Sequence, residues 1–361
     1  MITILGKDFD KKYLDKVKTL SLSPEAIQKE HDLRIVFTPL HGTTYELVPA
    51  SLRNWGFTNI HTVPEQSIPN GDFPTVASAN PEEPAAFKMA LDLARKIDAD
   101  LAMACDPDGD RIGIAVKNDA GEWTLLNGNQ TNIIFTEYII RRKKELNQLK
   151  GGEYTVKTIV TTELIKDIAE KNHIICYDVY TGFKWIADII RKEGGEKFIG
   201  GGEESFGYMP GAFTRDKDGV SATSLMAEIA AWVKMQNKTL YSFLKEIYAK
   251  YGFSQERMIY IVRKGLSGAQ EIKAMMEEFR HNTPKEINHS PVVLKKDYLS
   301  LEATNLQTGE KTHLDFETKS DVLQFFLADG SKISVRPSGT EPKIKFYFEA
   351  RTQMKDINDY E

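Results

Sequence analysis

Three aspartates at alternate positions stand out among the residues that could do chemistry. They are Asp106, Asp108 and Asp110, and Arg111 follows directly. Carboxylates this close repel one another and raise each other's pKa unless a cation neutralises them. Mg2+ and Ca2+ prefer hard oxygen ligands, and Mg2+ often joins a few carboxylates to a phosphate oxygen. With the planar guanidinium of Arg111 beside them, these acids predict a Mg2+ site for phosphoryl chemistry.

The same run is also typical of a solvated turn, since Asp, Pro and Gly are all common turn residues. A calcium-binding EF-hand is excluded more firmly, because its loop needs Gly at the sixth position and Glu at the twelfth. Here those positions hold Arg111 and Lys117. The metal interpretation therefore depends on what the rest of the chain provides.

A second candidate is the run Arg-Pro-Ser-Gly-Thr near the C-terminus, with Arg336, Ser338, Gly339 and Thr340. A guanidinium, two hydroxyls and a glycine that lets backbone N–H groups approach a ligand are the composition of a phosphate-binding loop. An ordinary loop with a Ser/Thr turn has the same composition.

Three more runs carry polar side chains after turns. In Gly-Glu-Glu-Ser-Phe-Gly, Glu203 and Ser205 can exchange hydrogen bonds with sugar hydroxyls, although an exposed acidic turn is the alternative. The run fails as a dinucleotide-binding fingerprint counted from Gly200, because Ser205 stands where the last glycine belongs. Lys184 in Thr-Gly-Phe-Lys and Lys217 in Arg-Asp-Lys-Asp-Gly follow turns, but a single lysine is usually solvated surface.

Strand-like and helix-like segments alternate around these runs. The apolar segment 99–105 predicts a buried strand before the Asp run, and 112–116 predicts a second strand after it. Such alternation indicates a parallel sheet with helices on its faces, and ligands bind beyond the carboxyl ends of its strands. We therefore predict an α/β protein with two consecutive α/β domains, built on mixed or parallel sheets, followed by a smaller α+β C-terminal domain.

We expect the α/β domain with the metal-binding Asp loop to span 1–145, a sugar-binding α/β domain 146–252, and the phosphate-binding α+β domain 253–361. The first two are similar in architecture but share no residue-level repeat. A long helical region is expected over 222–251. A closing helix is expected to begin near Arg351, so the last domain is expected to be truncated.

Composition sets the broad class. A chain of 361 residues, 41% hydrophobic and 27% charged, is typical of a soluble globular protein with two or three domains. A net charge of −5 without a basic block argues against nucleic acid as a partner. No apolar stretch approaches the roughly 20 residues of a membrane span, and no signal peptide is recognisable. Two cysteines, Cys105 and Cys176, fit a reducing compartment, so we predict a cytoplasmic protein.

Taken in order along the chain, the five motifs are more specific together than any one of them alone. The set resembles the α-D-phosphohexomutase superfamily, in particular its phosphoglucomutase/phosphomannomutase branch. The resemblance runs from about residue 10 to the end and covers what would be the second, third and fourth domains of that family.

The resemblance implies a role for each motif. It implies Mg2+ as cofactor, bound by Asp106, Asp108 and Asp110. It implies that Arg111 and Lys217 are catalytic. The substrate-binding residues that it implies are Thr181, Gly182, Lys184, Glu203, Ser205, Arg336, Ser338, Gly339 and Thr340. The implied substrates are glucose or mannose phosphates, and the implied reaction moves a phosphoryl group between the 1- and 6-positions through a bisphosphate intermediate.

One motif of the family is absent. The phosphoserine loop of the family is of the type Ser-His-Asn-Pro, and the superficially similar run 77–81 has Ala79 where histidine belongs. We therefore do not expect Ser78 to carry the phosphoryl group. We expect that the chain lacks the family's first domain, which would be its partner, and that by itself it is inactive and binds metal weakly.

Several alternatives stay open at this point. Phosphopentomutase and amino-sugar phosphate mutase are possible within the enzyme class, and Phe206 beside Ser205 favours the phosphoglucomutase and phosphopentomutase-like branch. A non-catalytic sugar-phosphate-binding protein is the alternative from another class.

Overall fold

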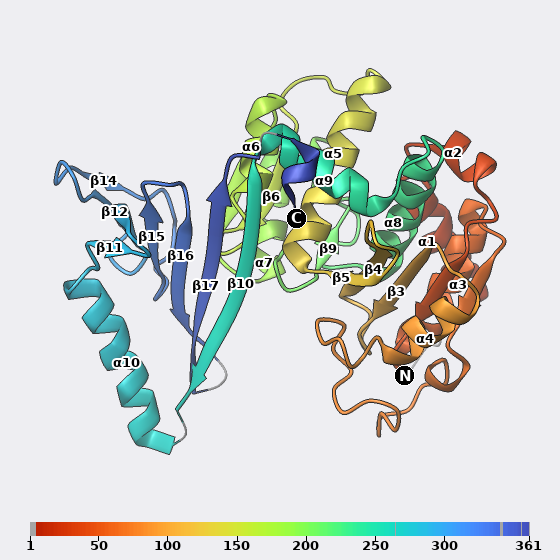
Figure 1. The fold of residues 1–361 in the computed structure, drawn as a ribbon, viewed down its shortest axis with the longest axis horizontal. Coiled ribbons are helices and arrows are strands. Elements are labelled where there is room, and N and C mark those ends of the chain that lie inside the picture. The colour runs from red at the N-terminus through yellow and green to blue at the C-terminus, as the bar shows by residue number, and fades with distance from the viewer. Residues whose placement is uncertain (1–4, 264, 340–341, 355, 361) are drawn as a thin grey trace. The chain divides into compact units, whose positions relative to one another are not determined.

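The structure is a computed structural model that describes residues 5–263, 265–339, 342–354 and 356–360 (Figure 1). It divides into two compact units, Met1–Tyr251 and Gly252–Glu361, called unit 1 and unit 2 below. Among the described residues, none of the helices combines the length and the apolar character that crossing a membrane requires.

Unit 1 contains two sheets. The strands of the first sheet are β1 (Ile35–Thr38), β2 (Ile60–Thr62), β3 (Leu101–Cys105), β4 (Ile112–Lys117) and β5 (Trp123–Leu126). Their order is β2-β1-β3-β4-β5; β1 pairs in parallel with β2 and β3, while β4 and β5 add antiparallel. Every residue of β1 and β3 is buried, as expected for central parallel strands covered on both faces.

The second sheet repeats this topology. Its strands are β6 (Tyr154–Thr158), β7 (Ile175–Val179), β8 (Phe198–Gly202) and β9 (Tyr208–Met209), in the order β7-β6-β8-β9. Strand β6 pairs in parallel with β7 and β8, and β9 adds antiparallel to β8. The prediction of consecutive α/β regions with mixed sheets is confirmed.

Helices cover both sheets of unit 1. They are α1 (Lys7–Lys18), α2 (Pro24–Lys29), α3 (Leu47–Trp55), α4 (Lys88–Lys96), α5 (Gly128–Glu145), α6 (Leu164–Lys171), α7 (Phe183–Glu193), α8 (Gly219–Lys234) and α9 (Leu240–Tyr251), with short 3-10 turns η1 (Thr43–Tyr45) and η2 (Pro64–Gln66). Helices α3 and α4 pack with strands of the first sheet, and α6 and α7 pack with strands of the second.

Two helices pack against strands that are not their nearest neighbours in the sequence. Helix α5, which lies within the predicted first domain of 1–145, packs against β8 and α6 of the second sheet. It starts at a capping box, in which Asn127 and Gln130 each donate a backbone N–H to the other's side chain at 2.9 and 2.8 Å. Helix α8 follows the second sheet in sequence but packs on α3, β3 and β4.

The expected single helical region over 222–251 is wrong in one respect. Helix α8 ends at Lys234, and α9 begins at Leu240. Between them Asn237 has a left-handed φ of 58°, a conformation that Asn tolerates and that ends a helix. Thr239 and Ser242 then exchange backbone-to-side-chain hydrogen bonds of 3.0 Å each at the start of α9.

Unit 2 is a predominantly antiparallel sheet with one long helix. Its elements are β10 (Phe253–Val262), α10 (Gly265–His281), β11 (Glu286–Ile287), β12 (Ser290–Asp297), β13 (Glu302–Asn305), β14 (Lys311–His313), β15 (Leu323–Leu327), β16 (Lys332–Pro337), β17 (Lys343–Thr352) and η3 (Ile357–Tyr360). The strand order is β10-β17-β16-β15-β12-β13-β14, and β11 pairs with β12. Residues Ile272 and Met276 of α10 share a core with Phe325 and Ile344 of the sheet. The predicted α+β C-terminal domain is confirmed.

The closing helix expected from Arg351 is not found there. Instead β17 continues through Thr352, because its last residues pair with the start of β10: Arg351 lies opposite Ser254 and Thr352 opposite Phe253. Pairing with a strand distant in sequence decides the structure of this segment.

Candidate metal and substrate site

The Asp loop, residues 106–111, connects β3 to the antiparallel strand β4, so it lies at the carboxyl end of a buried parallel strand. Gly109 has a φ of 76°, and a Cβ there would come within 2.5 Å of the Thr44 side chain. The loop therefore needs glycine for its conformation and for space. One carboxylate oxygen from each of Asp106, Asp108 and Asp110 lies within 4.8 Å of the other two.

The carboxylates differ in environment. Asp106 is buried and accepts hydrogen bonds from the backbone N–H groups of Asp110 (3.1 Å) and Arg111 (3.0 Å). Burial raises its pKa to about 7, the N–H of Arg111 opposes that shift, and the charges of the two neighbouring aspartates reinforce it. Asp108 is exposed, and Asp110 is intermediate.

These observations test whether the residues fit a metal ion. Three carboxylates converge, one of them is desolvated and hard to ionise, and Oδ1 of Asp110 is buried without a hydrogen-bond partner among the described residues. Oxygen-only donors of this kind suit Mg2+ or Ca2+. Asp106, Asp108 and Asp110 therefore fit a divalent cation.

Two cationic side chains adjoin the carboxylates. The Nζ of Lys217 lies 2.8 Å from Asp110 Oδ2 and 5.1 Å from the centre of the Phe183 ring. Burial lowers the pKa of Lys217, but the hydrogen bond and charge of Asp110 outweigh it, so the pKa is raised and the ammonium is retained. The Nε of Arg111 lies 3.4 Å from Asp106 Oδ2.

The Asp loop is joined to a second loop, residues 203–207, which we call the Glu loop. Ile112 donates its N–H to the Phe206 carbonyl at 3.0 Å, and Arg111 and Gly207 form an isolated antiparallel bridge. Gly207 has no room for a side chain, because a Cβ would overlap the aliphatic part of Lys217. The structure thus brings together motifs about 100 residues apart.

Glu203 starts the Glu loop at the carboxyl end of β8. Its buried carboxylate accepts the N–H of Gly182 at 2.6 Å, and its carbonyl accepts a hydrogen bond from Asn132 at 2.8 Å. Because Gly182 is the N-cap of α7, this bond ties the Thr-Gly-Phe-Lys turn to the Glu loop. Ser205 is half-buried in the same loop.

The remaining predicted residues of that turn lie beside it. Thr181 precedes Gly182, and Gly182 has a φ of 114°, which favours glycine. Lys184 is exposed, with its Nζ 5.0 Å from the centre of the Trp185 ring. The ammonium of Lys184 is therefore available to solvent and to ligands.

Sequence reasoning missed several residues that hold these loops. Glu82 lies 3.5 Å from Arg111 Nη1, and the hydroxyls of Thr158 (3.2 Å) and Thr161 (3.3 Å) donate to the Glu204 carboxylate. These contacts join distant segments and leave no local pattern in the sequence.

Another missed group anchors Lys217. The next residue, Asp218, caps α8 by accepting the N–H groups of Val220 and Ser221, and the Tyr13 hydroxyl donates to it at 2.7 Å. Gly219 donates its N–H to the Gly109 carbonyl at 3.0 Å. The Asp-Gly step before an apolar run is a helix-start signal that could have identified Asp218.

The predicted phosphate loop belongs to unit 2. Arg336 pairs with Lys345 in the β16–β17 ladder, and Ser338 donates its N–H to the Lys343 carbonyl at 2.8 Å. Gly339 is exposed after it, and Thr340 lies outside the described residues. A pocket of about 210 Å³ adjoins this hairpin and includes Ser338 and Lys343 in its lining.

Comparison with known families identifies the class. Residues 11–121 match "Phosphoglucomutase/phosphomannomutase, alpha/beta/alpha domain II", residues 127–251 match domain III, and residues 272–360 match the C-terminal domain of the same family. The chain belongs to the phosphoglucomutase/phosphomannomutase family, as the order of its motifs predicted.

Individual relatives agree. A phosphoglucomutase of Staphylococcus aureus is 38% identical over 317 residues, which is 88% of this chain and 56% of the relative. The chain thus spans about half the length of the curated relatives that it matches. Parafusin of Paramecium, a phosphoglucomutase in an open form, has the same fold with a TM-score of 0.68 at 18% identity, covering 97% of this chain and 58% of that one. A phosphomannomutase-like protein of Thermus thermophilus gives 0.64 at 18% identity, covering 95% and 62%.

Proposed function

We propose that this chain carries the metal-binding, sugar-binding and distal-phosphate-binding parts of a phosphohexomutase. The proposed reaction is a Mg2+-dependent interconversion of hexose 1-phosphate and hexose 6-phosphate through a hexose bisphosphate. The observation that supports it most is the junction of the Asp loop with the Glu loop, with Lys217 between them at 2.8 Å from Asp110.

In this proposal Asp106, Asp108 and Asp110 hold Mg2+, for which their oxygens fit. When bound, Mg2+ supplies positive charge that stabilises a phosphoryl group as it passes between oxygens. The neighbouring structure of N-acetylphosphoglucosamine mutase from Aspergillus fumigatus, with a TM-score of 0.52 at 14% identity, contains GlcNAc-6P and magnesium. Mg2+ is accordingly the ion that we test first.

Arg111 and Lys217 are the proposed catalytic residues. The phosphoryl group carries two negative charges, so transfer requires donors that are already in place and already cationic. Lys217 meets this condition because its pKa is raised and its position is fixed by Asp110 and by the capped α8. Arg111 presents a planar fork suited to phosphate oxygens, and Glu82 and Asp106 orient it.

Glu203 and Ser205 are proposed to bind sugar hydroxyls. A carboxylate accepts and a hydroxyl both donates and accepts, so the pair can serve either orientation of a hexose. Thr181, Gly182 and Lys184 form the turn bonded to Glu203 and are proposed to line the substrate site. Arg336, Ser338, Gly339 and Thr340 are proposed to hold the phosphate that is not being transferred.

The phosphoryl donor is proposed to be a phosphoserine that these 361 residues do not contain. Ser78 does not suit this role, because its hydroxyl donates to the Glu83 carboxylate at 3.0 Å. A phosphate on Ser78 would stand against that negative charge. The segment that bears the phosphoserine is therefore the proposed partner of this chain.

Glucose phosphate is the preferred substrate in this proposal over mannose, pentose and amino-sugar phosphates, because the curated relatives at 38% identity are phosphoglucomutases. The cytoplasm is the proposed location, since both cysteines are free thiols.

The test uses the purified 361-residue protein. Calorimetry should show glucose 6-phosphate binding that strengthens with Mg2+ and that Glu203→Gln or Arg336→Gln weakens. A coupled assay should show no conversion of glucose 1-phosphate by this chain, and conversion once a segment that bears the proposed phosphoserine is supplied. Absence of sugar-phosphate binding would refute the proposal, and turnover by the chain alone would refute the external phosphoserine.

A further inference from the structure

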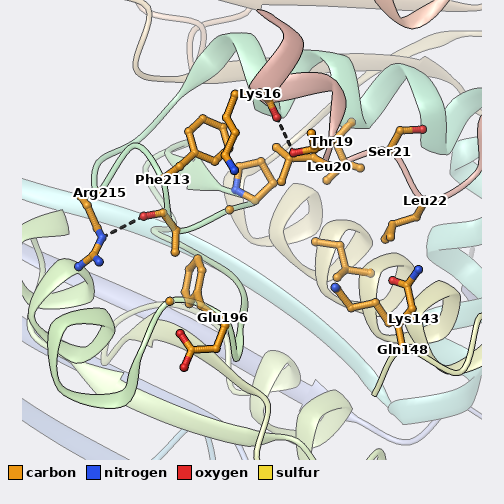
Figure 2. Close-up of a pocket in the computed structure, with 17 residues that line it drawn as sticks. Lys16, Thr19, Leu20, Ser21, Leu22, Lys143, Gln148, Glu196, Phe213 and Arg215 are labelled. Carbon is orange, nitrogen blue, oxygen red and sulfur yellow. Dashed lines mark hydrogen bonds between the residues drawn. The ribbon is translucent and has the colours of Figure 1, made fainter. Parts of the chain in front are cut away.

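A second pocket lies in unit 1 and has no residue of the Asp loop in its lining (Figure 2). It has a volume of about 560 Å³ and is lined by the end of α1 and the turn after it, the end of α5, the start of β8 and the segment 210–215. Small-molecule sites usually fall between about 300 and 1,000 Å³. The size therefore suits a small organic molecule.

The pocket and the Glu loop lie at opposite ends of β8. Phe198, the first residue of the strand, lines the pocket, whereas Glu203 follows its last residue. Five residues of extended chain span about 16 Å. A molecule in this pocket would therefore occupy a site separate from the metal and sugar site.

Positive charge predominates in the lining. Lys16 comes from α1, Lys143 from α5 and Arg215 from the segment after β9, while Glu196 is the acidic residue of the lining. In Figure 2, Arg215 and Lys143 lie on opposite sides of the pocket. An occupant with anionic groups at both ends would match this distribution.

None of these three cations has an ion pair with a described residue. Lys16 lies 5.9 Å from the centre of the Phe213 ring, and Arg215 donates its Nε to the Ala212 carbonyl at 2.9 Å. Arg142, adjacent to Lys143, is by contrast paired, with its Nη2 2.8 Å from Glu25 Oε1. Lys143 is the partly buried cation of the three, whereas Lys16 and Arg215 are exposed. A partly buried charge is normally compensated, so the ammonium of Lys143 favours an anionic ligand.

Two local features support this. Burial lowers the pKa of Lys143, against the attraction of Glu153, so this ammonium is partly desolvated without a close counter-ion. Arg215 has a left-handed φ of 62°, an uncommon conformation for a residue with a side chain. Strain of this kind often occurs where a side chain is held for binding.

The lining also has an apolar part. Leu20, Phe198 and Phe213 are among its residues, and Gly211 packs so closely on Leu20 that a Cβ there would lie 2.6 Å from its Cδ2. An apolar wall with a few charged groups is the usual composition of a site for an organic ligand.

We propose that this pocket binds a small organic polyanion, with phosphate or carboxylate groups facing Lys16, Lys143 and Arg215 and its carbon skeleton against Phe198 and Phe213. The ligand class includes organic bisphosphates and di- or tricarboxylates.

The test is calorimetric titration of the 361-residue protein, without divalent metal and at constant ionic strength, with citrate, pyrophosphate and acetate as probes. We expect citrate or pyrophosphate to bind, and acetate to bind far more weakly. Lys143→Gln should weaken that binding about tenfold, the loss of one charge-assisted hydrogen bond. Lys144→Gln, an exposed neighbour outside the pocket lining, is the matched control and should have no effect.

Two further variants keep the result interpretable. Lys16→Gln changes an exposed side chain, so it tests the pocket even where Lys143→Gln fails to fold. Arg336→Gln separates this pocket from the proposed phosphate loop of unit 2: the binding that the lysine variants weaken should remain in it. The proposal is overturned if neither polyanion binds at concentrations up to about 10 mM. It is equally overturned if binding persists in both lysine variants or disappears only in Arg336→Gln.

Discussion

The two sheets of unit 1 share a topology, but they present different chemistry at equivalent positions. Strands β3 and β8 each pair in parallel with a neighbouring strand, are fully buried, and are followed directly by an acidic residue, Asp106 or Glu203. Each acid is followed by a loop that returns as an antiparallel strand. The carboxyl end of the strand is thus used twice as a place for a reactive side chain.

The difference lies in how each carboxylate is neutralised. Glu203 receives a backbone N–H from Gly182 at the start of a helix, so the protein itself stabilises its charge. Asp106 also receives two N–H groups, but burial and two further aspartates outweigh them and raise its pKa to about 7. The Asp loop is therefore suited to binding a cation, whereas in the Glu loop the charge of Glu203 is stabilised without one.

The largest effect should come from removing a metal-binding carboxylate. Asp108→Asn is expected to lower Mg2+ affinity at least about 100-fold, measured by calorimetry, because a ligand charge is lost. Asp108 is exposed, so the melting temperature of the metal-free protein should change little. Asp92→Asn, an exposed aspartate on α4, is the control. Equal Mg2+ affinity in Asp108→Asn and the native chain would remove the distinction between the two loops.

The conformation of the Glu loop should depend on packing rather than on a metal ion. A Cβ at Gly128 would overlap the Glu204 carbonyl, so Gly128→Ala should displace the Glu loop and destabilise unit 1 by about 2 kcal/mol in chemical unfolding. Alanine is otherwise the better helix former, so helix propensity acts in the opposite direction. Gly71→Ala, which meets no atom within 4 Å, is the control. Stability unchanged in Gly128→Ala would show that this loop adapts freely.

The raised pKa of Asp106 predicts a pH dependence. The bound metal needs an ionised Asp106, so Mg2+ affinity should fall about tenfold per pH unit below the pKa of about 7 and level off above it. In the metal-free protein, Asp106 has a pKa of about 4 when the chain is unfolded and about 7 when it is folded. Between these two pH values the folded state binds more protons than the unfolded state, so the stability should decrease as the pH rises from about 4 to about 7.

Calorimetry from about pH 5.5 to about 8, on both sides of the pKa of about 7, measures the Mg2+ affinity. Melting curves in EDTA over the same range measure the stability of the metal-free protein. A Mg2+ affinity that does not vary with pH would mean that Asp106 is already ionised without the metal. The charge of Asp106 would then be stabilised by the protein itself, as that of Glu203 is.

The smallest effect is expected beside Glu204. Thr161 is fully buried and donates to the Glu204 carboxylate at 3.3 Å, while Thr158 donates to the same oxygen. Thr161→Val keeps the shape and removes the hydrogen bonds of the Thr161 hydroxyl to the Glu204 carboxylate and to the Thr158 hydroxyl, the latter at 2.8 Å. It should therefore cost about 1.5 kcal/mol in unfolding and leave Mg2+ affinity unchanged. A loss of Mg2+ affinity in this variant would mean that the two loops are coupled.

Much of the fold could be predicted because the strands of unit 1 are short apolar runs bounded by turn residues. Residues 101–105 are apolar throughout, and the Asp run follows directly, so both the strand and its loop were recognisable. The packing partners of α5 and α8 could not be predicted in the same way, since an apolar helix face does not specify which sheet it covers. Nor could the path of β17, which pairs with a strand about 90 residues earlier.

The sequence by itself determined which chemical groups are present and the family to which their order belongs. It also determined the local conformations, such as the left-handed Gly109 in the Asp loop and the Asp218 cap of α8. Only the tertiary structure decided that Lys217 stands 2.8 Å from Asp110 and that Gly182 donates to Glu203. The physical reason is that the first contact depends on the packing of α8 onto the first sheet, and the second on the parallel pairing of β7 and β8 with β6. Both depend on burial between segments far apart in the chain.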